Sequence, residues 1–184
     1  MSSATLRFLK IVLGSVLLAC LLGIQLDLVT ANVAVEYFSV HHPRIVASEN
    51  PFVLAVVWGI AASWWFGAIA GAILATVNHL RPHPLSAAKI LKWSAIACFI
   101  LWVLMIAILV IVMAIAGTIP ETDRRPTFEQ DRRLVAVAMA HQYEYLFGAI
   151  ALLVISLLTW RSPPRQNPTS SATDPPEQVS ESGT

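Results

Sequence analysis

Charged side chains are scarce in this sequence. Asp, Glu, Lys and Arg together make up 12% of its 184 residues, whereas hydrophobic residues make up 57%. That charged fraction is about half the usual value for a soluble domain, and it is too small to cover a surface that faces water. The mean hydropathy of +0.68 agrees. The composition therefore indicates an integral membrane protein of a single domain.

The sequence also lacks an excess of basic charge and any cysteine pair. The net charge is +1, so there is no basic surface of the kind that binds nucleic acid, and we expect no such partner. Cys20 and Cys98 both lie in apolar runs and form neither a CxxC pair nor a zinc-ligand spacing. This pattern excludes a thiol redox centre. There is likewise no phosphate-binding glycine loop and no nucleophile motif.

What the sequence does contain is four long apolar runs, at about 8–30, 52–78, 91–117 and 134–160. A membrane-spanning helix needs about 20 apolar residues, because the hydrocarbon core is roughly 30 Å thick and each residue rises about 1.5 Å. We therefore predict an all-α fold in which 1–161 form a four-transmembrane-helix bundle. The tail 162–184 is rich in Pro, Ser and Thr, and we expect it to be disordered and cytoplasmic.

Polar residues mark several helix ends. Asn50 precedes a proline and is expected to cap the second helix, and Ser86 is expected to cap the third. Gly117 is expected to end the third helix. Thr127 and Gln130 have the spacing of a capping box, which predicts that the fourth helix begins in water before it enters the membrane.

Lys and Arg in the short loops predict the orientation. Seven of them share the side of the two termini and five lie on the other side, so we expect both termini in the cytoplasm. The seven are Arg7, Lys10, Arg81, Lys89, Lys92, Arg161 and Arg165, and the five are Arg44, Arg124, Arg125, Arg132 and Arg133. Apolar residues continue past Cys20 to Leu26, so the first run is read as a retained helix and not as a cleaved signal peptide.

Ionisable residues within lipid are costly and need a reason. His141, Glu144 and Tyr145 lie three and four residues apart, on one face of the fourth helix. By depth, Asp27 and Gln25 on the first helix are their expected partners, although these two point in roughly opposite directions. Such a group could bind a metal, relay a proton, or only fix the packing of the helices.

A second group of candidate ligands lies on the same side of the membrane. Glu36 extends the polar stripe of the first helix if that helix continues beyond the lipid, and the connection that follows contains His41, His42 and Glu49. Histidine and carboxylate side chains are the usual ligands of divalent metals, so a metal site is one interpretation. Plain surface residues are the other. We predict no further cofactor.

Small residues recur every four positions in the second helix, at Ser63, Gly67 and Gly71. This spacing lets another helix approach closely. It predicts helix packing, either within the chain or between copies in a homo-oligomer.

Two stretches of this sequence, Glu36-Tyr-Phe-Ser-Val-His-His-Pro43 and Trp58-Gly with Trp64-Trp65-Phe-Gly67, are similar to a group of uncharacterised bacterial four-helix membrane proteins. The resemblance implies the architecture and a bacterial origin, so we expect the chain in the inner membrane of a bacterial cell. It transfers no activity.

Three functions follow as hypotheses. The first is a non-enzymatic subunit or accessory of a membrane complex, with the lipid bilayer and other membrane proteins as partners. The second is a small proton- or ion-coupled transporter that uses Asp27, His141 and Glu144. The third is an outward-facing, metal-dependent membrane enzyme.

Overall fold

The computed structural model describes residues 1–120 and 127–163, and this part of the chain contains helices and no strand. The long helices are α1 (Ser3–Val33), α3 (Pro51–His79), α4 (Ala87–Gly117) and α5 (Phe128–Arg161), and a short helix α2 (Val35–Ser39) follows α1. Each of the four long helices is long and apolar enough to cross a membrane. The predicted fold class, an all-α bundle of four spanning helices, is confirmed.

The long helices run beyond the predicted apolar stretches. Helix α1 has 31 residues, a length of about 46 Å at 1.5 Å per residue, well over the roughly 30 Å hydrocarbon core. The reason is that hydropathy reports the depth of lipid, whereas capping side chains decide where a helix begins. Asn50 accepts hydrogen bonds from the backbone N–H groups of Phe52 and Val53, and Ser86 accepts one from Lys89, as predicted.

The predicted capping box at the start of α5 is wrong in its bonding. The hydroxyl of Thr127 donates to the Asp131 carboxylate at 2.7 Å and makes no hydrogen bond to the helix N–H groups. A capping residue normally has an extended backbone, whereas Thr127 has φ −87° and ψ 0°, so the backbone conformation required for the cap is absent. The helix nevertheless starts at Phe128, a turn and a half before the apolar run, as expected.

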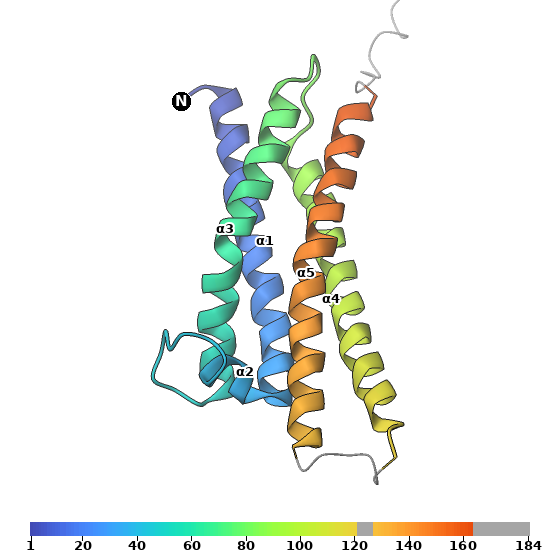
Figure 1. Ribbon diagram of the computed structural model, residues 1–184. Coiled ribbons are helices and arrows are strands. Elements are labelled where there is room, and N and C mark those ends of the chain that lie inside the picture. The colour runs from blue at the N-terminus through green and yellow to red at the C-terminus, as the bar shows by residue number, and fades with distance from the viewer. Residues whose placement is uncertain (121–126, 164–184) are drawn as a thin grey trace, which may run out of the picture.

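The helices form two closely associated pairs (Figure 1). Helix α1 lies alongside α3, and α4 lies alongside α5. The N terminus, the α3–α4 connection and the last turn of α5 lie together at one end of the bundle, which we call the N-terminal end. Helix α2 and the loop 40–50 cover the opposite end, which we call the α2 end.

The small-residue stripe of α3 packs against α1 of the same chain. A Cβ atom added at Gly67 would lie 2.7 Å from the Cα atom of Val16, and one added at Gly71 would lie 2.8 Å from that of Val12. Neither distance leaves room for a side chain. The predicted packing role is therefore filled within the chain, and Ser63 continues the stripe as a buried residue on the same face.

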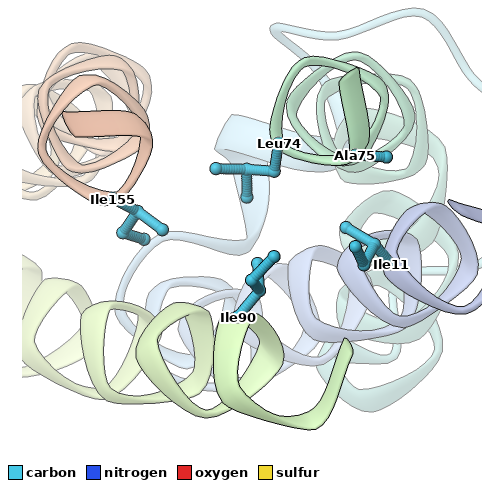
Figure 2. Close-up of a cluster of buried hydrophobic side chains, with 5 residues drawn as sticks. All are labelled: Ile11, Leu74, Ala75, Ile90 and Ile155. Carbon is cyan, nitrogen blue, oxygen red and sulfur yellow. The ribbon is translucent and has the colours of Figure 1, made fainter. Parts of the chain in front are cut away.

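Apolar side chains from all four long helices close the bundle towards its N-terminal end. Figure 2 shows them pointing into one shared space between the helices. This cluster, which we call the N-terminal plug, consists of Ile11, Leu74, Ala75, Ile90 and Ile155. Each is at most 7% exposed, so the plug leaves little room for water.

Described carboxylates are confined to one half of the bundle, whereas Lys and Arg lie at both ends, with Arg44, Arg132 and Arg133 at the α2 end. Of the described residues, those with carboxylates lie between mid-bundle and the α2 end. They are Asp27, Glu36, Glu49, Glu129, Asp131 and Glu144. Described Lys and Arg side chains near the N-terminal end are Arg7, Lys10, Arg81, Lys89, Lys92 and Arg161. The predicted disordered tail, apart from its first two residues, lies outside the described ranges, as do Arg124, Arg125 and Arg165.

Candidate functional site: a buried carboxylate and histidine group

Asp27 and His141 meet across the interface of α1 and α5. Asp27 is 3% exposed, and its Oδ1 atom lies 3.4 Å from Nε2 of His141. In the part of the chain that the structure describes, this imidazole is the one ion-pair or hydrogen-bond partner of the Asp27 carboxylate. The two residues predicted to pair by depth are therefore brought together. Gln25, the other expected partner, lies on the exposed side of α1 and takes no part.

Glu144 lies on the other side of the same imidazole. Its Oε2 atom is 3.7 Å from Nδ1 of His141, and its side chain is 13% exposed. The ring thus stands between two carboxylates in largely buried surroundings. We call Asp27, His141 and Glu144 the acid–histidine triad.

Thr30 contacts the same ring nitrogen as Asp27. Its hydroxyl donates to the carbonyl oxygen of Leu26 at 3.2 Å and lies 3.3 Å from Nε2 of His141. The tautomer with hydrogen on Nε2 satisfies both contacts, because the hydroxyl oxygen then accepts from the ring while its own hydrogen stays on Leu26.

The tautomer places a proton-binding position between His141 and Glu144. With Nε2 protonated, the neutral ring has a lone pair at Nδ1, and this lone pair faces the Glu144 carboxylate. Two acceptors so placed repel each other unless a proton resides on one of them. A proton on either atom would relieve this repulsion, and at 3.7 Å, beyond the reach of a direct hydrogen bond, the two atoms could share it only through a bridging water.

Helix α2 covers the triad with two aromatic rings. Tyr37 stacks on His141 with centroids 5.2 Å apart and an interplanar angle of 6°, and Phe38 meets the same ring edge-on at 5.7 Å. Burial raises the pKa of the Tyr37 phenol, and the carboxylates of Asp27 and Glu144 raise that pKa further. The phenol therefore stays neutral beside the triad.

His42 joins the site through the loop that follows α2. Its Nδ1–H donates to the carbonyl oxygen of Tyr37 at 2.7 Å, and its ring meets Trp58 of α3 with centroids 5.0 Å apart. His41, the adjacent residue, is exposed. Sequence reasoning found His42 but missed Trp58, which is half-buried and lies next to Gly59, the residue one turn before Ser63 on the small-residue face of α3.

A cavity of about 90 Å³ lies at the α2 end, against these residues. One water needs roughly 10–15 Å³ by the same measure, so the cavity has room for several waters or a compact ligand. We call it the outer cavity. Its wall carries two carboxylates and two imidazoles, from Asp27, Glu144, His42 and His141. It also carries four aromatic rings, from Tyr37, Phe38, Trp58 and Tyr145.

A second cavity, of about 80 Å³, lies deeper between the helices and is lined mainly by apolar side chains. We call it the inner cavity. Glu144, Tyr145 and Ser63 line both cavities, so Glu144 stands at their junction. Leu74 and Ile155 of the N-terminal plug line the far side of the inner cavity. The hydroxyl of Tyr145 donates to the carbonyl oxygen of Ala62 at 3.0 Å, which ties α5 to α3 at this junction.

The remaining predicted ligands are not brought together. Helix α1 ends at Val33, because Ala34 has φ −147° and ψ 85°, and the chain restarts as α2. Glu36 therefore lies half-buried on α2 and leaves the predicted stripe. Glu49 is exposed and pairs with Arg44 at 3.9 Å. Across residues 1–120 and 127–163, no three His, Cys, Asp or Glu side chains are grouped as a metal site requires.

Fold and site together define a multi-pass membrane protein with an ionisable group buried between its helices. Comparison with family models, with curated proteins and with solved structures gave no match for this chain. The resemblance noted for the first two long helices accordingly depends on the quoted residues alone, and function must be argued from the site.

Proposed function

We propose that the protein is a small proton-coupled carrier in which the acid–histidine triad binds and passes protons. The observation that carries the proposal is the approach of Oε2 of Glu144 to Nδ1 of His141, at 3.7 Å in largely buried surroundings. Ionisable residues inside a membrane bundle that face one another and a cavity are typical of proton relays.

The burial of Asp27 supports the proposal independently. Removing a carboxylate from water costs several kcal/mol unless a proton or a cation compensates its charge. Asp27 is 3% exposed and its polar partner is the His141 ring. A proton bound by the ring would compensate the Asp27 carboxylate, so proton binding by the triad would involve all three of its side chains.

The two cavities mark a path that protons could follow through the bundle, because both are lined by Glu144. The outer cavity leads from the α2 end to the triad, and Glu144 also lines the inner cavity. In the inner cavity, Ser15 has a buried hydroxyl oxygen without a hydrogen-bond partner among the described atoms. A water there would satisfy this hydroxyl and extend the relay beyond Glu144. Beyond it the N-terminal plug must repack for transport, which supports alternating access to the two sides.

We further propose that the N-terminal end faces the cytoplasm of a bacterial cell, with the chain in the inner membrane. The basic residues at that end, and the acidic ones towards the other, support this orientation. Reporter fusions test it. An enzyme that is active only outside the cytoplasm should be active when inserted in the loop 40–50 and inactive when inserted in 81–86. The reverse pattern would overturn the orientation.

Proton flux in reconstituted vesicles tests the carrier. With a pH-sensitive dye inside, vesicles that contain the protein should dissipate an imposed pH difference faster than empty vesicles. His141→Ala and Glu144→Gln should remove this acceleration. Glu49→Gln is the matched control, since Glu49 is an exposed carboxylate at the same end. Equal rates in empty vesicles, or an unchanged rate in both triad variants, would contradict the proposal.

The two other hypotheses, a subunit of a larger complex and a metal-dependent enzyme, stay predictions. Within the described ranges we find no contact that favours either one.

A further inference from the structure

We propose that the outer cavity binds a compact organic cation, of the alkylammonium class, in exchange for a proton. This inference rests on the proposed carrier function and names the substrate class of the same site. Three features of the cavity wall carry it: the aromatic rings, the sign of the charge, and the volume.

The aromatic rings come from three separate parts of the chain. Tyr37 and Phe38 are on α2, Trp58 is on α3, and Tyr145 is on α5. Aromatic faces attract ammonium groups through the ring quadrupole, and several rings around one space form the cage that recognises alkylammonium ions. A cage of this kind selects a cation over a neutral molecule of the same shape.

Apart from its two imidazoles, the ionisable groups of the cavity wall are acidic. Asp27 and Glu144 contribute carboxylates, and the lining includes no Lys or Arg among the described residues. Among the residues that the structure describes, the Asp27 carboxylate has no polar partner other than the His141 ring, at 3.4 Å. A bound ammonium group would compensate this buried carboxylate, as a proton otherwise does.

The volume limits the ligand. About 90 Å³ of accessible space suits a cation of a few heavy atoms. Larger organic cations would have to displace the rings of α2. Inorganic cations would fill the space poorly and gain little from the aromatic wall.

Exchange follows from the shared carboxylates. When a monovalent cation enters, the proton held between His141 and Glu144 is released to water, so the charge of the site stays constant. Groups that face this position from neighbouring elements are Tyr37 on α2, His42 on the following loop, Cys98 on α4 and Tyr145 on α5. The residues of α3 that line the two cavities include no ionisable side chain. Cation binding should therefore weaken as the pH falls.

Calorimetry on the full chain in lipid nanodiscs tests this, with choline as the probe. Its neutral isostere 3,3-dimethylbutan-1-ol is the matched control. Choline should bind, the isostere should not, and titrations in buffers of different ionisation enthalpy should report close to one proton released per choline. Equal binding of both compounds, or none of either, would overturn the inference.

Two pairs of variants locate the site. Trp58→Leu should weaken choline binding by about fivefold to thirtyfold, the range of a desolvated cation–π contact. Trp64→Leu on the same helix should leave binding unchanged, because Trp64 is 53% exposed and lies outside the cavity lining. Asp27→Asn should weaken binding by more than about thirtyfold, and Glu49→Gln should not. A near-equal loss in both members of each pair would contradict the site.

The experiments distinguish failure of the proton-carrier proposal from failure of the organic-cation proposal. Proton flux that depends on His141 and Glu144, without choline binding, would keep the carrier and remove the organic cation. Choline binding without proton release or proton flux would keep the binding site and remove the proton coupling.

Discussion

The imidazole of His141 and the carboxylate of Asp27 meet across the α1–α5 interface, with Nε2 of the ring 3.4 Å from Oδ1 of the acid. Glu144 approaches the opposite nitrogen of the ring at 3.7 Å. One imidazole thus separates two carboxylates that would otherwise repel each other at close range. This arrangement makes His141 the residue on which the stability of the triad depends.

Removing the ring should therefore destabilise the protein more than removing one acid does. His141→Ala leaves the buried Asp27 side chain without its imidazole partner, a loss of about 1–3 kcal/mol in the free energy of unfolding. Adding Asp27→Asn to this variant should restore a large part of the loss, because a neutral amide is less costly to bury than a carboxylate. Unfolding in mixed detergent micelles, measured for both single variants and the double variant, gives the coupling energy. Additive effects would contradict a direct interaction.

The phenol of Tyr37 should ionise above its ordinary pKa of 10.0, because burial and the two nearby carboxylates both oppose the phenolate. The chain has three tyrosines, so the difference between the alkaline absorbance titrations of the wild type and Tyr37→Phe isolates this one. Asp27→Asn should move the pKa of Tyr37 back down.

The sign of the effect on stability follows from the same shift. The unfolded chain releases this proton near pH 10, before the folded chain does, so the contribution of Tyr37 to stability falls as the pH rises above 10. Tyr37→Phe should remove this alkaline loss. An identical pH dependence in both proteins would contradict the buried placement of the phenol.

Gly67→Ala should loosen the α1–α3 pair. The added methyl group would lie 2.7 Å from the Cα atom of Val16, where backbone must move, and overpacking of this kind costs about 1–3 kcal/mol. Gly117→Ala is the control, because there the nearest atom is the end of the flexible Arg132 side chain at 3.4 Å. Thermal unfolding in detergent compares them. Equal stability of the two variants would argue against the close α1–α3 contact.

The N-terminal plug should limit proton leakage. Ile90→Ala shortens a fully buried side chain of the plug shown in Figure 2 and enlarges the space next to the inner cavity. Vesicles with this variant should lose a pH difference faster than those with wild-type protein, and the variant should be less stable by about 2–4 kcal/mol. Ile96→Ala on the same helix, at a 48% exposed position, should change neither quantity. A plug variant with wild-type leakage would place the barrier elsewhere.

Sequence reasoning predicts the fold well, because each spanning run must be long and apolar and nothing else in the chain competes with it. The pairing of Asp27 with His141 also follows from depth along two helices. The depth of a residue along a helix does not predict how the helix is rotated about its own axis. It is this rotation that places Asp27 inside the bundle and Gln25 outside it. The break at Ala34 was equally inaccessible, since no glycine or proline marks it. That break folds α2 back over the triad and brings Tyr37 and Phe38 to the His141 ring.

The central claim is that the acid–histidine triad binds protons as one unit, and infrared difference spectroscopy over a pH titration tests it most directly. The wild type should show a protonated-carboxyl band whose intensity follows the pH. Glu144→Gln should remove a part of that band, Asp27→Asn another part, and His141→Ala should shift the midpoint of what remains. Glu49→Gln should leave the band as in the wild type. A carboxyl band that titrates identically in the wild type and all three triad variants would contradict the account.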